Sequence, residues 1–130
     1  MESFNHKYQN YLNALEKLKE AVQIIEPDEV QIDGIIQRFE FTFELAWKTI
    51  KEYLEFMGIT EDVVGPRGVL KTAFAEGIIY DGDAWIEMMA ARNNVSHRYD
   101  YEESRNIYIA IKEKYITLLE ELCNKLNRGE

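Results

Sequence analysis

Apolar residues recur at intervals of three and four along most of the chain, which places them on one face of an α-helix. The first such stretch covers residues 4–25 and stops at Glu26-Pro27-Asp28, where Asp28 is a suitable N-cap for a second helix. Its apolar positions are Phe4, Tyr8, Tyr11, Leu12, Leu15, Leu18, Val22 and Ile25. The chain is therefore expected to begin with two consecutive helices.

The second helix is expected over residues 29–57, closed by Gly58 just past its end. Phe41 and Leu45 fall on roughly the opposite side from its main apolar face, at about 100° per residue. A helix that is apolar on both sides lies at the centre of a fold, or contacts its own core with one side and a partner with the other. The main face carries Ile32, Ile36, Phe39, Phe43, Trp47, Ile50 and Leu54.

Two shorter helices and a long one follow. Pro66 is favourable at a first helical position, and Gly77 is expected to end the short helix that it begins. Asp81-Gly82-Asp83 reads as a turn and cap for a helix over residues 84–95. A long final helix is expected after Tyr101. Its apolar stripe is Ile107, Tyr108, Ile111, Tyr115, Leu118, Leu119 and Leu122.

No segment alternates with period two for long enough to predict a strand. Short connections between about five helices indicate an all-α fold, an antiparallel up-and-down bundle of the four-helix-bundle type. The 130 residues form one expected domain, 1–130, since domains most often contain about 100–150 residues.

The composition permits a core without disulfides, because 46% of the residues are hydrophobic and there is one cysteine. That residue, Cys123, lies on an apolar stripe and is expected to pack as a small hydrophobe. Trp47 and Trp85 are likewise expected in the core and not as platforms for base stacking. No apolar leader or stretch of about 18 apolar residues is visible, so a cytoplasmic protein with no membrane span is expected.

The formal net charge of −9 argues against a protein that coats nucleic acid non-specifically, because such binding depends on Lys and Arg neutralising phosphates. It is compatible with an enzyme that handles a polynucleotide at one local basic site. It is equally compatible with docking onto a basic protein partner.

The most reactive candidate segment lies where the fourth helix is expected to end. His97 has Arg92 five residues before it and Tyr99 two residues after it, whereas His6 lies among polar residues near the N-terminus. Imidazole titrates near neutral pH and can carry a proton, while the guanidinium fork matches phosphate oxygens. The plain alternative is a helix C-terminus, where such cations contribute about 0.3–1 kcal/mol against the helix dipole.

Spacing puts a condition on this pair. On a continuous helix, residues five apart diverge by about 140°, whereas Asn93 and His97, four apart, share a face. Arg92 and His97 can therefore reach one phosphate in two ways. The helix can unwind after about Val95, which Ser96 favours as a poor helix-interior residue. Otherwise the second subunit of a symmetric homodimer can supply the complementary residue.

The other candidates are weaker. Glu40 and Glu44, four apart, could form a carboxylate pair, but Glu44 and Lys48 are equally well placed for an i,i+4 ion pair worth about 0.2–0.5 kcal/mol. Arg67 lies in Gly65-Pro66-Arg67-Gly68, which is too short for a phosphate loop of the Gly-x4-Gly-Lys type. No residues stand at the spacing of metal ligands. We therefore expect neither a metal nor a cofactor.

Three blocks of the sequence together resemble a known family. Residues 39–48, Phe-Glu-Phe-Thr-Phe-Glu-Leu-Ala-Trp-Lys, resemble the second-helix signature of the nucleotidyltransferase substrate-binding proteins. Gly65-Pro66-Arg67, and Trp85 followed by residues 88–97, match later blocks of that family in order and spacing. The family belongs to the HEPN superfamily of helical bundles, and the resemblance covers essentially the whole chain.

The resemblance implies a function. HEPN ribonucleases carry Arg, a polar residue and then His a few residues on, which here correspond to Arg92, Asn93 and His97. Members paired with a minimal nucleotidyltransferase encoded nearby extend this to His-x-Tyr, matched by His97-Arg98-Tyr99. In such pairs the helical protein resembles a toxin that cleaves RNA without a metal. Its partner resembles an antitoxin that transfers AMP to the tyrosine, here Tyr99.

The older family name implies a different class of function, a non-catalytic module that presents substrate to a separate nucleotidyltransferase. A DNA-binding regulator ranks third, because no helix carries a basic stripe. The ribonuclease ranks first. Its expected catalytic residues are Arg92, Asn93 and His97, its AMP acceptor is Tyr99, and its supporting candidates are Glu40, Glu44, Lys48, Arg67 and Ser96.

Overall fold

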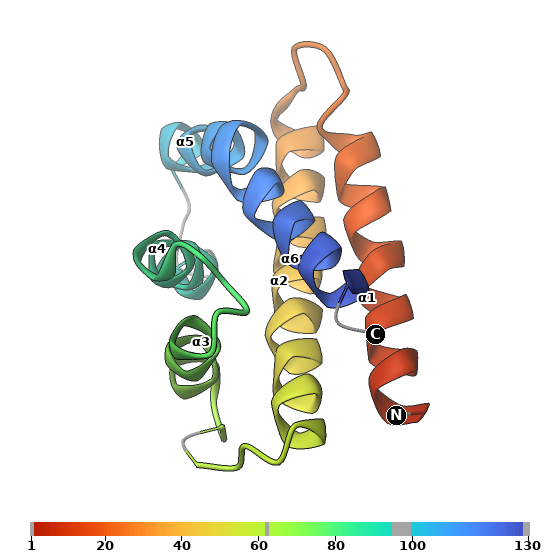
Figure 1. Cartoon of the computed structure of the whole chain (residues 1–130). Helices are drawn as coiled ribbons and strands as arrows, with labels where there is room; N and C mark the ends of the chain where they lie inside the picture. The colour runs from red at the N-terminus through yellow and green to blue at the C-terminus, as the bar shows by residue number, and fades with distance from the viewer. Residues whose placement is uncertain (1, 62, 95–99, 129–130) are drawn as a thin grey trace.

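The computed structural model describes residues 2–61, 63–94 and 100–128, and this part of the chain contains helices and no strand (Figure 1). Residues 101–128 are helical without a break and form one long helix. The all-α prediction of about five helices is therefore confirmed. In chain order the elements are α1 (Glu2–Ala21), α2 (Glu29–Phe56), α3 (Pro66–Ala75), α4 (Gly82–Asn94), α5 (Tyr101–Ala110), the π-helical η2 (Ile111–Tyr115) and α6 (Ile116–Arg128).

The central element is α2, which packs against α1, α3, α4 and α5. Figure 1 shows α1 and α2 side by side and antiparallel, with α6 lying across them, while α3 and α4 cross α2 on the side away from α1. Within the described residues, no helix has the length and apolarity needed to cross a membrane. The α2 helix is central to the fold, while its second apolar side is left exposed at Phe41, so the alternative of a partner on that side stays open.

The core joins all the helices through the predicted apolar stripes. Phe39 on α2 stacks on Tyr115 with ring centroids 5.5 Å apart, and Phe43 packs against Trp85 at 6.4 Å. These contacts attach the long final helix and α4 to the same face of α2. Phe41, in contrast, leaves 62% of its surface exposed, as expected for the opposite side of that helix.

The helix boundaries follow the capping residues. Asp28 caps α2 by accepting a hydrogen bond from the backbone N–H of Gln31 at 2.8 Å, and the Gln31 side chain accepts from the Asp28 N–H at 2.9 Å. Gly58 and Gly77 adopt positive φ values of 82° and 77°, which glycine tolerates without strain. Each lies just beyond a helix, as predicted.

The first helix is shorter than its apolar spacing predicts. It ends at Ala21, and Ile25 is 87% exposed in the connection to α2. Pro27 disfavours helical geometry at the residue before it, and Glu26 has a positive φ of 49°. The chain must leave the helix early to make this reversal, so Ile25 does not continue the stripe.

The final helix contains a wide turn that the sequence does not predict. Ile107, Ile111, Tyr115 and Leu119 are four residues apart, and each such step drifts by about 40° on an α-helix of 3.6 residues per turn. The π-helical η2, with its wider turn, absorbs this drift and keeps these side chains in the core. At its end, the Tyr115 hydroxyl donates to Glu87 of α4 at 3.0 Å, and Lys114 Nζ donates to the same carboxylate at 2.9 Å.

Candidate functional site

Arg92 lies in the last turn of α4 and faces the middle of α2. Its Nη2 donates to Glu44 Oε2 at 2.7 Å, a distance typical of a charge-assisted hydrogen bond. The two side chains keep 31% and 30% of their surface exposed. The guanidinium is thus held in place by a carboxylate while part of it faces solvent, an arrangement suited to receiving an anion.

Glu44 also contacts two neighbours on its own helix. Its Oε2 accepts a hydrogen bond from Trp47 Nε1 at 3.1 Å, and its Oε1 pairs with Lys48 Nζ at 3.4 Å. Lys48 Nζ lies 5.9 Å from the centroid of the Trp47 ring. One carboxylate therefore faces two cations, and the cluster is locally positive on a chain whose formal net charge is −9.

The remaining donors of Arg92 are less well satisfied. Nη1 donates to Asn93 Oδ1 at 3.3 Å, while Nε is buried and has no hydrogen-bond acceptor among the described residues. Leaving a buried donor unpaired costs about 1–3 kcal/mol. Native proteins contain few such buried unpaired donors, and a functional role is one of the explanations for them.

The structure gathers some of the predicted site residues and leaves others apart. Arg92, Asn93, Glu44 and Lys48 form the cluster just described. Glu44 forms the predicted ion pair with Lys48, while Glu40 is half-buried and forms no ion pair with a described residue, so the carboxylate pair stays a prediction. The other supporting candidate, Arg67, is exposed in the first turn of α3. Ser96, His97 and Tyr99 belong to residues 95–99, which lie outside the described part of the chain.

The two tryptophans lie in different surroundings. Trp85 is 2% exposed and lies in the core, as expected. Trp47 is partly buried, packs against the core and donates its indole N–H to Glu44, so the core prediction holds only in part for this residue. The spacing of three between Glu44 and Trp47 is the one sequence signal for this contact. Nothing local indicates that Arg92, 48 positions away, completes it.

Other chemistry in the described residues is limited. No group of three or more His, Cys, Asp and Glu side chains there is arranged to bind a metal ion. Cys123 is buried, and burial raises the pKa of its thiol to about 11. A thiol with so high a pKa is a poor nucleophile at neutral pH, which supports the prediction that Cys123 is a packing residue.

The chain matches the sequence model of a family described as nucleotidyltransferase substrate binding protein like, over residues 6–128. The chain belongs to this family. The matched range includes all of α2, α3 and α4, and thus the whole Glu44–Arg92 cluster. The resemblance carried by the three sequence blocks is therefore confirmed at the level of the family.

Individual relatives support the same family assignment. A Haemophilus influenzae protein named probable ribonuclease HepT is 37% identical over 97 residues, which cover 70% of this chain and 66% of that relative. The chain thus spans slightly less than two thirds of that protein.

Two solved structures share the fold over nearly their full length. A protein from Thermus thermophilus has a TM-score of 0.83 at 32% identity, covering 91% of this chain and 99% of its own. A Haemophilus influenzae protein has a TM-score of 0.81 at 28% identity, covering 92% and 98%. Its structure is described as revealing the fold of a substrate-binding domain of a nucleotidyltransferase.

Proposed function

We propose that this protein is a metal-independent endoribonuclease of the HEPN type, the toxin partner of a minimal nucleotidyltransferase that silences it by transferring AMP to Tyr99. The observation that carries the proposal is the guanidinium of Arg92, held by Glu44 and partly open to solvent five residues before His97. The name of the Haemophilus influenzae relative, probable ribonuclease HepT, supports the same reaction class.

In the proposed reaction the 2′-hydroxyl of the RNA attacks the adjacent phosphorus, and the bond from phosphorus to the 5′-oxygen breaks. His97 takes the 2′-hydroxyl proton and later returns it to water, while the departing 5′-oxygen takes up a proton from water, so the products are a 2′,3′-cyclic phosphate and a 5′-hydroxyl. Arg92 stabilises the charge that develops on the phosphoryl oxygens. The proposed role of Asn93 is to orient the imidazole of His97, four residues further on.

A homodimer is part of this proposal. Phe41 is 62% exposed, and Leu45 next to Glu44 lines the same shallow hollow of about 330 Å³ between α1 and α2. Because Phe41, Glu44, Leu45 and Lys48 share one side of α2, a two-fold contact through Phe41 and Leu45 would bring two Arg92 clusters to the rim of one cleft. The second subunit would then supply the His97 that complements each Arg92.

The test of catalysis uses protein purified without its partner and shown by intact mass to be unmodified. Cleavage of a 5′-labelled RNA should persist in EDTA, and RNA carrying 2′-O-methyl groups should resist. His97→Ala should lower the rate about 10²–10⁴-fold, and Arg92→Ala about 10²–10³-fold. Arg105→Ala, which removes an exposed arginine of α5, is the matched control and should leave the rate unchanged. Unmodified wild-type protein that cleaves no RNA overturns the proposal.

The silencing step is tested by co-expression with the neighbouring nucleotidyltransferase. Intact mass should rise by whole AMP units, and Tyr99→Phe should abolish the increase. Tyr101→Phe is the control, because Tyr101 is an exposed tyrosine two residues further on. AMP on a residue other than Tyr99 contradicts this part of the proposal.

A second candidate is a non-catalytic subunit that presents substrate to the nucleotidyltransferase. The substrate-binding role described for the Haemophilus influenzae structure favours it, and the locally positive Glu44–Lys48–Arg92 cluster would bind a phosphorylated substrate equally well. This candidate predicts no RNA cleavage and a higher rate of nucleotidyl transfer by the partner when the protein is added.

A further inference from the structure

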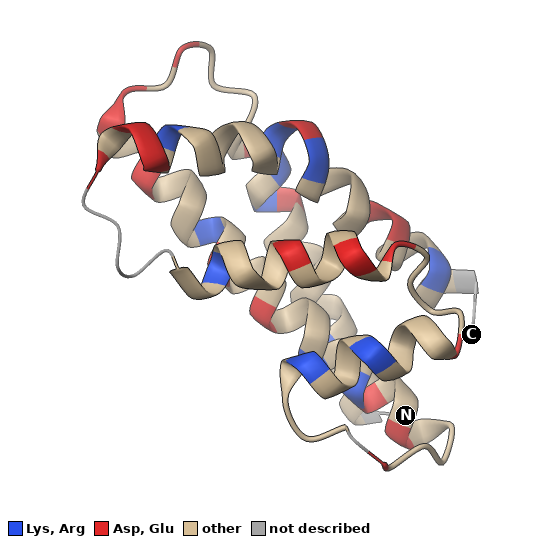
Figure 2. Cartoon of the chain, turned by 90° about the vertical axis from the view of Figure 1, so that its left-hand side faces the viewer, with Lys and Arg blue, Asp and Glu red and all other residues tan. Residues whose placement is uncertain are grey.

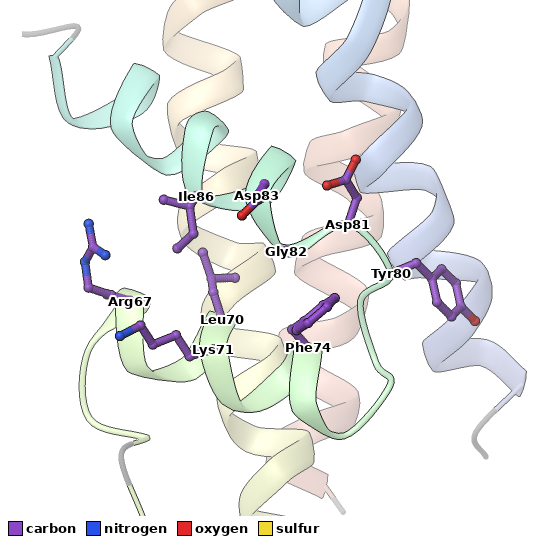
Figure 3. Close-up of a pocket in the computed structure, with 9 residues that line it drawn as sticks. All are labelled: Arg67, Leu70, Lys71, Phe74, Tyr80, Asp81, Gly82, Asp83 and Ile86. Carbon is purple, nitrogen blue, oxygen red and sulfur yellow. The ribbon is translucent and has the colours of Figure 1, made fainter.

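A groove lies between α3 and α4, beside the cluster but separate from it. Its volume is about 560 Å³, within the range of about 300–1,000 Å³ usual for small-molecule sites. Figure 3 shows Arg67 and Lys71 at one end, Tyr80 and Asp81 toward the other, and Phe74 between them. None of the predicted catalytic residues lines it, so the proposed chemistry does not account for this groove.

Charge is distributed unevenly along the groove. Arg67 and Lys71 are one turn apart on α3, both are exposed, and neither forms an ion pair with a described residue. Because α3 contains no acidic residue, its basic face is uncompensated within that helix (Figure 2). Asp81 and Asp83 line the groove beyond them. A negatively charged phosphate is therefore attracted to the α3 end and repelled from the other.

Phe74 provides an aromatic surface in the middle of the groove. It is 53% exposed. Gly82 makes room for its ring, because a Cβ at position 82 would lie 3.1 Å from Phe74 Cγ and Cδ1. One side of the ring therefore rests on the start of α4 while over half of the side chain remains accessible. A flat, accessible ring close to free cations suits a nucleobase attached to its phosphate.

The groove leads toward Arg92. Figures 2 and 3 show α3 starting on the side where α4 ends, so the two helices run in opposite directions. Asp83 and Ile86 line the groove, and Asn93 lies on the same stripe of α4, seven residues after Ile86. At about 1.5 Å per residue this is only about 10 Å along the helix. Asn93 Oδ1 in turn accepts a hydrogen bond from Arg92.

We propose that the α3–α4 groove is a guide site for single-stranded RNA, in which a phosphate binds Arg67 and Lys71, a base stacks on Phe74, and the strand continues along α4 to Arg92. This rests on the proposed function for the identity of the ligand as RNA. The base beside Phe74 also contacts the apolar side chain of Ile86, which is partly buried and lines the groove. Stacking on a ring is tolerant of sequence, so the site selects for an unpaired strand and not for a particular base.

The test measures binding separately from cleavage. A fluorescent 2′-O-methyl oligonucleotide, which the proposed mechanism cannot cut, is titrated with the full chain by anisotropy at several salt concentrations. Arg67→Ala with Lys71→Ala should weaken binding at least tenfold. The slope of log affinity against log salt should become shallower by about 0.7 for each phosphate that is no longer neutralised. Lys7→Ala with Lys112→Ala removes the same charge from α1 and η2 and should change neither quantity.

The aromatic contact has its own pair of variants. Phe74→Leu should weaken binding about tenfold while Phe74→Tyr, which keeps a ring, retains it. Phe56→Leu is the control, because Phe56 is similarly exposed at 58% at the end of α2. Unchanged melting curves by circular dichroism show that each variant folds, so a loss of affinity reports the contact itself.

The outcomes separate this proposal from the catalytic one. Wild-type protein that cleaves RNA, with affinity unaffected in the groove variants, overturns the guide site and leaves the ribonuclease intact. Binding that depends on Arg67, Lys71 and Phe74 without any cleavage supports the guide site and overturns the ribonuclease. Variants that bind the oligonucleotide normally but no longer bind the nucleotidyltransferase show that the groove is a protein-binding surface, which overturns the guide site.

Discussion

The contact between Glu44 and Arg92 can be tested by replacing the carboxylate with its neutral isostere. Glu44→Gln keeps an oxygen that can accept the Trp47 indole N–H, now 3.1 Å away, but removes the charge that holds Arg92 at 2.7 Å. The change thus isolates the charge of Glu44 from its packing and from its hydrogen bond to Trp47. Combining it with Arg92→Gln completes a double-mutant cycle.

The size of the coupling follows from the exposure of the pair. Fully exposed ion pairs contribute about 0.2–1 kcal/mol, and hydrogen bonds to charged groups about 1.5–3 kcal/mol. With both side chains about one-third exposed at 31% and 30%, we expect a coupling of about 1 kcal/mol. The loss of about 1 kcal/mol of unfolding free energy corresponds to a decrease in Tm of about 4 °C, because the unfolding entropy is about 2.1 cal/mol/K per residue and the chain has 130 residues.

Urea denaturation followed by tryptophan fluorescence and circular dichroism measures the cycle. The control is the Lys19–Glu120 pair, with a similar distance of 2.8 Å but exposures of 41% and 42%, which should show a smaller coupling. A Glu44–Arg92 coupling no larger than that of the control refutes the inference that Glu44 holds Arg92 in place.

The same variant separates positioning from binding. If Glu44 orients Arg92, kcat for RNA cleavage falls by about ten- to a hundredfold in Glu44→Gln, because a displaced Arg92 no longer meets the developing charge. KM should not rise, because removing a carboxylate reduces repulsion of the phosphate. A raised KM with an unchanged kcat would show that Glu44 contributes to binding and not to the position of Arg92.

Three further predictions concern the rest of the fold. Hydrogen bonds from Lys114 and Tyr115 lower the pKa of Glu87 in the folded protein. The stabilisation that these bonds give the fold is therefore full above pH 4.5, the ordinary pKa of this carboxyl group, and is lost as the pH falls through the lower pKa of the folded state. Urea denaturation against pH should show this loss, and Glu87→Gln should abolish it. Burial and the bond to Glu87 raise the pKa of Tyr115 from 10.0 to about 12, so its contribution is full below pH 10.0 and declines as pH rises toward 12. Burial also raises the pKa of Tyr11, so ultraviolet titration of the phenolates should show two late tyrosines, of which the one at about pH 12 is absent in Tyr115→Phe. Phe39→Ala should cost about 3–5 kcal/mol of unfolding free energy, whereas Phe41→Ala should leave the fold intact and weaken self-association by light scattering.

The local elements of this protein are readable from its sequence because their causes are local. Asp28 and Gln31 form their capping box within one turn, and Gly58 and Gly77 allow the positive φ that ends a helix. The stripes that form the core depend only on the angle of about 100° between successive residues. The same angle places Phe41 on the outer side of α2, where it is 62% exposed. Helix number, order and buried faces can therefore be derived without knowing how the helices meet.

What the sequence could not decide is which faces meet across long separations. The stripe of α4 predicts that Trp85 and Met88 are buried, but the phase of a helix does not specify its neighbour. The packing of α4 on α2 brings Arg92 to Glu44 across 48 positions, beside Trp47, which packs against the core and donates to the same carboxylate. The antiparallel approach of α3 and α4 likewise places Arg67 in a groove that no local motif describes. Periodicity determines the direction in which a side chain points, and only tertiary packing determines what it meets there.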